Sequence, residues 1–94
     1  MQVDIAITEE WITWQKEEHI PEMMATKLFT EFSLYKLLEQ EESETITYVV
    51  QYSTASKDNY DKFLNQYAPG LRSKALLRWG SRFLAFRTLM ELVQ

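Results

Sequence analysis

The segment "TITYVVQYS", residues 45–53, alternates between two sets of side chains. One set is Ile46, Tyr48, Val50 and Tyr52, and the residues between them form the other. A period of two, built from β-branched and aromatic residues, is typical of a β-strand. We therefore predict a strand over residues 45–53 and place the rest of the chain around it.

A second strand is predicted just before it, over residues 29–39, "FTEFSLYKLLE". Large apolar side chains fall on both of its faces: Phe32, Leu34 and Leu38 on one, and Phe29, Tyr35 and Leu37 on the other. The acidic run "QEESE", residues 40–44, separates the two segments. We expect it to be the turn of an antiparallel hairpin.

The N-terminal segment predicts a strand and then a helix. Residues 3–7, "VDIAI", alternate as a half-buried strand does. Thr8 stands before two glutamates, which suits the N-cap and the positive end of a helix dipole. Trp11, Trp14 and His19 share the inward arc of this helix. Because Pro21 disfavours helical geometry at the residue before it, we expect the helix to end near His19.

The second half of the chain predicts two helices and a strand. Ser56 is placed to cap a helix whose apolar stripe is Tyr60, Phe63, Leu64 and Tyr67. Pro69 and Gly70 interrupt it, and residues 69–79 are predicted to form a shorter helix that ends at Gly80. Residues 82–93, "RFLAFRTLMELV", alternate again and predict the last strand.

The predicted element order is βαββαβ over one domain, residues 1–94. This order predicts an α+β fold with a four-stranded antiparallel sheet and both helices on one face. The predicted strands carry large apolar residues on both faces, so the face without helices needs a cover. We expect a homodimer that buries at least about 1,200 Å² in total.

Composition limits the classes of function. The chain has no cysteine, which excludes disulfides, thiolate catalysis and zinc–thiolate sites and fits the cytoplasm. No apolar run is long enough for a membrane span, and no signal peptide is visible. Residues 1–47 hold eleven acidic and three basic side chains, whereas residues 48–94 hold three acidic and seven basic ones. With a net charge of −4 and no broad basic stripe, nucleic-acid binding is not expected.

Several short motifs resemble one known family. They are Trp11 and Trp14 leading into "EHIPE" at residues 18–22, "AT" at 25–26, "QY" at 51–52, "AP" at 68–69 and "FRT" at 86–88. Together they resemble a family of short, uncharacterised bacterial proteins that form a domain of unknown function. The family is similar to the ferredoxin-like group whose members pair into a dimeric α/β barrel, a group that includes cofactor-independent monooxygenases and isomerases. The resemblance implies this fold and no particular activity, and it implies glycine at the turn position that Lys27 occupies.

Five residues are candidates for a site: Trp11, His19, Glu22, Tyr52 and Arg87. His19 could act as a general base or ligand anchor, with Glu22 beside it, or could simply complete a helix end. Arg87 is predicted mid-strand, where it would need an anionic ligand or a structural carboxylate such as Asp4 or Glu31. Tyr52 could present its hydroxyl to a ligand or pack as a wall. A metal site is not expected, because the chain offers a single imidazole.

Two functions remain open. The first is a small-ligand-binding or cofactor-independent catalytic domain, with a cavity between the first helix and the sheet lined by His19, Trp11, Tyr52 and Arg87. The second is a non-catalytic homodimeric interaction module. No cofactor is expected in either case, and the sequence does not decide whether the chain is an enzyme.

Overall fold

The hairpin that the sequence predicts is the longest strand pair in the structure. The computed structural model describes residues 1–38, 44–91 and 93. Strand β2 (Glu31–Lys36) pairs antiparallel with β3 (Thr45–Ser53), with Phe32 opposite Tyr52. The bounds of β3 agree with the prediction, whereas β2 is shorter than residues 29–39. The predicted acidic turn lies almost wholly at residues 39–43, outside the described residues.

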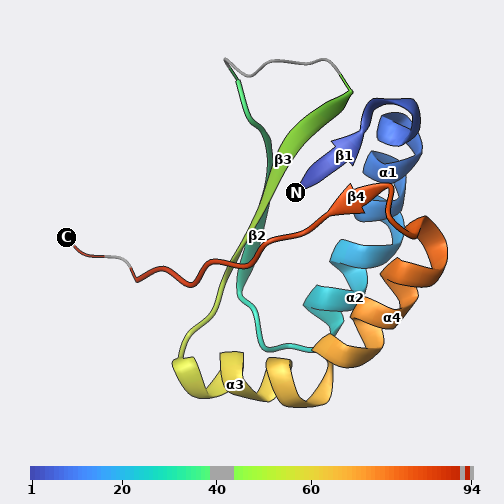
Figure 1. The fold of residues 1–94 in the computed structure, drawn as a ribbon. Helices are drawn as coiled ribbons and strands as arrows, with labels where there is room; N and C mark the ends of the chain where they lie inside the picture. Colours follow the sequence, from blue (N-terminus) through green and yellow to red (C-terminus); the bar gives the residue numbers. More distant parts are fainter. Residues whose placement is uncertain (39–43, 92, 94) are drawn as a thin grey trace.

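The sheet has four antiparallel strands in the order β2-β3-β1-β4 (Figure 1). Strand β1 (Gln2–Asp4) lies between β3 and β4 (Phe83–Leu84). Three helical segments accompany it in the described part of the chain. The predicted α+β class with an antiparallel sheet is therefore confirmed.

Strand β1 is shorter than the predicted residues 3–7. The Asp4 carboxylate accepts a hydrogen bond of 2.9 Å from the Ala6 N–H and turns the chain into a 3₁₀ turn, Ile5–Ile7. Ile7 is still buried, but Ile5 is 47% exposed. A short aspartate side chain that captures a nearby backbone N–H competes with a strand ladder, and here it ends the strand.

The first helical segment runs past Pro21, so the predicted end near His19 is wrong. Helix α1 (Thr8–Trp14) continues through a π-helical turn (Gln15–His19) into α2 (Ile20–Ala25). In the wide turn the Ile20 N–H donates to the Gln15 carbonyl, five residues back. Pro21 then falls in the first turn of α2, where its missing N–H is tolerated.

Helix α2 ends in a left-handed residue. Lys27 has φ 63°, and its N–H donates to the Met24 carbonyl at 3.1 Å. Glycine is the usual residue at such a helix end, because it carries no Cβ. This agrees with the glycine that the family resemblance implies at this position.

The two later helices form as predicted. The Ser56 side chain caps α3 (Lys57–Gln66) by accepting from the Asn59 N–H at 3.2 Å. Helix α4 (Ala68–Trp79) follows, with proline in its first turn, and ends at Gly80, whose φ is 60° and ψ is −127°. Only glycine adopts this backbone conformation readily.

Two buried clusters hold the helices against one face of the sheet. The first joins β1 and β3 to the three tryptophans; its buried members are Val3, Ile7, Trp11, Trp14, Ile46, Tyr48 and Trp79. The second lies at the other end, under α3, and its buried members are Met23, Phe29, Phe63 and Ala68. Each buried aromatic side chain contributes roughly 2–3 kcal/mol of transfer free energy relative to exposure.

The predicted last strand, residues 82–93, is confined to Phe83–Leu84. Leu84 already pairs with Gln2, the first residue of β1, so the ladder offers residues 85–91 no further partner. These residues have no regular structure and are all exposed, and in the view of Figure 1 they pass in front of β2 and β3 and continue beyond them. Arg87 is therefore not a mid-strand residue.

Candidate functional site

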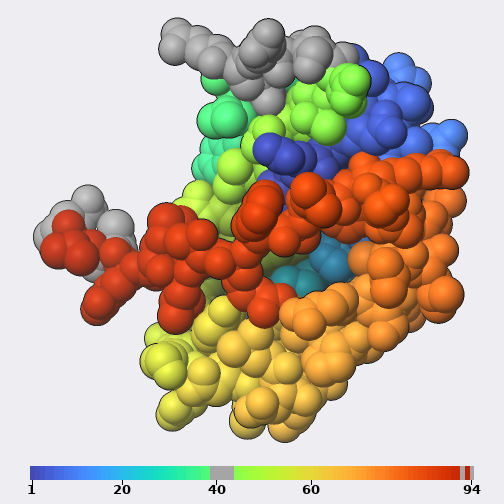
Figure 2. Space-filling view, viewed as in Figure 1, coloured from blue at the N-terminus to red at the C-terminus, as the bar shows by residue number. Residues whose placement is uncertain are grey.

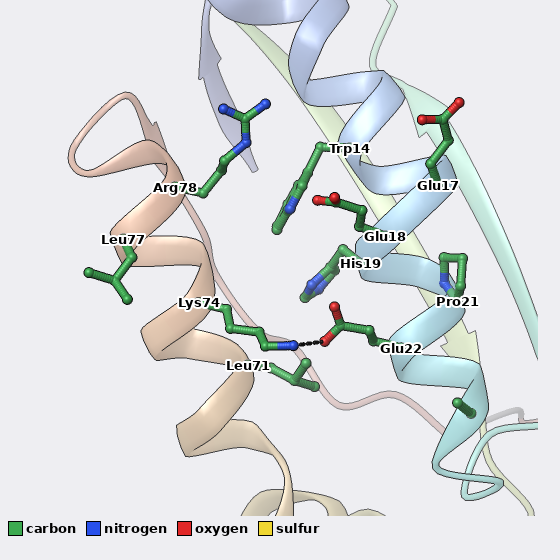
Figure 3. A pocket seen from close by; sticks show the side chains of 11 residues that line it. Trp14, Glu17, Glu18, His19, Pro21, Glu22, Leu71, Lys74, Leu77 and Arg78 are labelled. Atoms are coloured by element: carbon green, nitrogen blue, oxygen red, sulfur yellow. Dashed lines mark hydrogen bonds and ion pairs between the residues drawn. The ribbon is translucent and has the colours of Figure 1, made fainter.

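A groove of about 720 Å³ lies between the first helical segment and α4 (Figure 3). It is open to solvent along its length. Its lining comes from both helices: Trp14, Glu17, Glu18, His19, Pro21, Glu22, Ala25, Leu71, Lys74, Leu77 and Arg78. The groove combines an aromatic base, acidic side chains on one wall and basic side chains on the other.

The π-helical turn builds the aromatic base. In a regular α-helix, residues five apart point about 140° away from each other. The wide turn between Trp14 and His19 changes this spacing, and the two rings stack with centroids 4.8 Å apart and planes 22° apart. Single π turns are common at functional sites, because they redirect a side chain without ending the helix.

Burial controls the protonation of His19. Desolvation lowers the pKa of its imidazole, and the negative charge of Glu22 partly opposes that by raising it. The ring is therefore neutral at pH 7, with one nitrogen that donates a hydrogen bond and one that accepts. A neutral imidazole beside a stacked indole suits recognition of a polar group on an otherwise apolar molecule.

Opposite charges face each other across the groove. Lys74 Nζ lies 3.0 Å from Glu22 Oε2, and this ion pair joins α4 to α2 (Figure 3). One turn further along α4, the Arg78 guanidinium lies 4.4 Å from the centroid of the Trp79 ring. Glu18 lines the groove from the other wall. The groove lining thus has two cations, Lys74 and Arg78, at i, i+4 spacing, and three carboxylates, of which Glu18 and Glu22 have the same spacing.

The structure brings together two of the five residues that the sequence analysis proposed. His19 and Glu22 both line the groove. Trp11 is fully buried in the first cluster. Tyr52 packs against the second cluster, with its ring 5.3 Å from that of Phe29. Arg87 lies on the exposed C-terminal segment, with its guanidinium 5.9 Å from the Phe63 ring.

The Tyr52 hydroxyl is buried and has no hydrogen-bond partner among the described residues. Burial raises the pKa of this hydroxyl, so it stays protonated. It is not part of the groove and cannot meet a ligand bound there.

Trp14, Lys74 and Arg78 line the groove but are not among the five candidates; the concentration of Arg72, Lys74, Arg78 and Arg82 in one late segment indicates only a local anion or phosphate site. Trp14 was assigned to the core, which is correct, but its ring also supports His19. Lys74 and Arg78 belong to the basic segment of the second half, and their i, i+4 spacing puts them on one face of a helix. Glu18 and Glu22 are also four residues apart. Two acidic residues and two basic residues with the same spacing are the sequence signal that could have predicted contact between these two helices.

The fold and the groove together define a small α+β domain with an open antiparallel sheet and a helix–helix groove. A family model described as Domain of unknown function (DUF4286) matches residues 1–93. The chain belongs to that family. Neither a comparison with curated proteins nor one with solved structures found a match. None of the described helices has the length and apolar character needed to cross a membrane.

Proposed function

We propose that this chain is a small-ligand-binding domain and that its site is the groove between the first helical segment and α4. The ligand class that fits is a zwitterion with an apolar or aromatic part, such as an amino acid or a close derivative. The observation that carries the proposal is the stacked, neutral His19 placed between side chains of both charges.

The charge arrangement supports a zwitterion over an ion of one sign. A carboxylate can approach Lys74 and Arg78, and an ammonium group can approach Glu18 and Glu22. Lys74 and Glu22 already pair with each other, so a simple anion would leave Glu18 without a counter-charge and a simple cation would leave Arg78 without one. The His19 and Trp14 rings offer the apolar part a flat surface.

The site proposed here replaces the predicted cavity between helix and sheet. Trp11 and Tyr52, which were to line that cavity, pack within the two core clusters. A neutral imidazole at the edge of a groove can also exchange a proton with a bound molecule. Binding is the function we propose, because nothing in the groove assigns a reaction.

Three matched probes test the ligand class: L-phenylalanine, 3-phenylpropionate and phenethylamine. They share the aromatic part and carry both charges, the negative charge alone or the positive charge alone. Calorimetric titration should give the tightest binding for phenylalanine. Lys74→Met should weaken that binding about tenfold, the loss of one charge-assisted contact. Lys62→Met, an exposed lysine on α3 outside the groove, is the control.

Equal affinity for the three probes, or equal weakening by both lysine variants, would contradict the zwitterion site. If only 3-phenylpropionate bound, the groove would be a site for anions and not for zwitterions.

We also propose that the domain is ferredoxin-like and acts as a homodimer. The strand order β2-β3-β1-β4 and the antiparallel pairing support the ferredoxin-like assignment. Exposed apolar side chains support the dimer: Phe32, Tyr35, Val49, Leu84, Phe86, Leu89 and Met90 are each more than 40% exposed. Light scattering at micromolar concentration should give twice the 11.2 kDa chain mass, and the monomer mass would contradict the dimer.

A further inference from the structure

We propose that a second hollow continues the groove and takes the end of a long apolar side chain. The ligand class is then an α-amino acid whose apolar side chain is longer than that of phenylalanine. The inference rests on the proposed function, because it keeps the zwitterion site and adds the length of the ligand that fills it.

The second hollow has a volume of about 250 Å³ and is lined by Glu22, Ala25, Thr26, Tyr67 and Leu71. Three of these, Glu22, Ala25 and Leu71, also line the groove, so the two spaces adjoin. No described residue beyond Arg78 lines either space. In the view of Figure 2, residues 85–91, in red, project on the side away from α4, in orange. This segment therefore leaves the site open.

Two polar side chains of the second hollow already have partners. The Thr26 hydroxyl is bonded to backbone groups of its own turn, donating at 2.8 Å and accepting at 3.3 Å. The Glu22 carboxylate is held in its ion pair with α4. The remaining surface comes from Ala25, Leu71 and the Tyr67 ring, which is 38% exposed. An apolar group is the part of a ligand that fits such a surface.

The free charges lie at the opposite end of the groove. Glu18 and Arg78 line the groove there, and neither forms an ion pair with another described residue. Figure 3 shows Arg78 at the same end as Trp14, and Leu71 at the other end. The ammonium and carboxylate groups of an α-amino acid share one carbon atom, so both can bind at the charged end. The side chain then points along the groove toward the second hollow.

Helix geometry gives the length of the site. Arg78 and Leu71 are seven residues apart on α4. Glu18 and Ala25 are seven residues apart on the facing wall. At about 1.5 Å per residue, each wall runs roughly 10 Å from its charged end to its apolar end. A phenylalanine side chain reaches only about 5 Å from its Cα at ordinary bond lengths, so it stops about halfway.

The ion pair between Lys74 and Glu22 lies where the two spaces meet. Its side chains are 67% and 38% exposed. An exposed ion pair contributes little to stability, because water and salt screen it. A ligand that shifts these two side chains therefore does so at little cost to the fold.

A dipeptide fits these walls less well than a long side chain does. Its peptide N–H and C=O would lie along Ala25 and Leu71, which offer no side-chain polar atom, and unpaired polar groups are costly to remove from water. Its two charges also lie at opposite ends of the molecule, whereas the free Glu18 and Arg78 lie at one end of the groove.

Three straight-chain L-amino acids test the length: 2-aminohexanoate, 2-aminooctanoate and 2-aminodecanoate. They share the zwitterionic head and differ only in the number of CH₂ groups. In calorimetric titration the affinity should rise with chain length. Each added CH₂ should strengthen binding about twofold, half the effect of full burial, so 2-aminodecanoate should bind at least about tenfold more tightly than 2-aminohexanoate.

Two substitutions locate the end of the side chain. Tyr67→Ala removes a wall that belongs to the second hollow alone, and Ala25→Trp fills the hollow from an exposed position at the end of α2. Each should reduce the preference for 2-aminodecanoate over 2-aminohexanoate to less than about threefold. Tyr60→Ala on α3, which lines neither space, is the matched control and should keep the full preference.

The outcomes keep this inference apart from the proposed function. If phenylalanine and 2-aminohexanoate bind but chain length adds nothing, the second hollow is overturned and the zwitterion site stands. If none of the amino acids binds, both are overturned. A preference for 2-aminodecanoate that persists in both Tyr67→Ala and Ala25→Trp would place the end of the side chain elsewhere and overturn the inference. Tighter binding of the dipeptide phenylalanyl-leucine than of 2-aminodecanoate would overturn it as well.

Discussion

At the scale of single residues, His19 is the group whose charge depends on the fold. Burial against Trp14 lowers its pKa below the 6.5 of a free imidazole. The unfolded chain therefore binds more protons than the folded one at pH values just below 6.5. The free energy of unfolding must rise with pH in that range.

We expect the stability contributed by a neutral His19 to be present above pH 6.5 and lost as the pH falls below it. In urea unfolding, the free energy of unfolding should fall more between pH 7.5 and pH 5.5 for the natural chain than for His19→Gln, whose residue 19 does not titrate there. Since carboxylates and the N-terminus are common to both proteins, the difference isolates the histidine. A loss that is equal in both proteins would contradict a lowered pKa.

Glu22 is the second residue that sets this pKa. Its negative charge raises the pKa of His19 and so works against burial. Glu22→Gln should therefore move the pKa further down, as followed by NMR of the ring, whose signals are unique because the chain has one histidine. Glu31→Gln on β2 is the control and should leave the pKa where it is. An upward movement in Glu22→Gln would show that the carboxylate acts on the ring in another way.

At the scale of elements, three backbone positions decide how helices end and how firmly they form. Gly80 at the end of α4 has φ 60° and ψ −127°, so Gly80→Ala should cost about 1–3 kcal/mol although no atom lies within 4 Å of the added Cβ. Gly70 is helical and equally uncrowded. Gly70→Ala should stabilise by about 0.5–1 kcal/mol, because alanine favours a helix.

Lys27 gives the opposite test at the end of α2. Its φ of 63° strains any residue with a Cβ, and its side chain is exposed. Lys27→Gly should therefore raise the unfolding free energy by about 0.5 kcal/mol, a shift of a few degrees in Tm. Thermal unfolding of Gly80→Ala, Gly70→Ala and Lys27→Gly measures all three expected changes in Tm. If Gly80→Ala and Gly70→Ala shifted Tm in the same direction, backbone conformation would not be the cause.

The π-helical turn shows where local sequence reasoning stops. Pro21 correctly indicates that a regular α-helix cannot pass unchanged through residues 17–21. Two responses are open to the chain: it can end the helix or widen one turn. Trp14, Ile20 and Met23 are all buried, and widening the turn keeps all three on the core side. Core packing therefore favours the wider turn over the end of the helix, and the wider turn brings the rings of Trp14 and His19 into their stack.

At the scale of the whole molecule, the sequence predicted those elements whose signals are local. The alternation over β3, the Ser56 cap of α3 and the glycine at the end of α4 each act within a few residues, and each is confirmed. The predicted length of β4 was wrong because a strand needs a hydrogen-bonding partner as well as an alternating sequence. Strand β1 pairs with only two residues of β4. Whether a partner exists is a property of the sheet, or of a second chain.

The candidate site was predictable to a similar extent. His19 and Glu22 were identified because a unique histidine beside a carboxylate is visible in any sequence. Their partners on α4 come from more than 50 residues later, and only the packing of α4 against the first helical segment brings Lys74 to within 3.0 Å of Glu22. Trp11, Tyr52 and Arg87 were grouped with them by assuming one cavity at the sheet, and the groove lies elsewhere.

The ring of His19 offers the most direct test of the proposed site, because its NMR signals need no assignment in a chain with one histidine. Titration with L-phenylalanine should shift the His19 ring signals and the Trp14 indole signal together and leave the Trp11 indole, which is fully buried, in place. The same shifts should be several-fold weaker in Lys74→Met and unchanged in Lys62→Met. Ring signals of His19 that stay fixed while phenylalanine binds would place the ligand outside the groove and contradict the account.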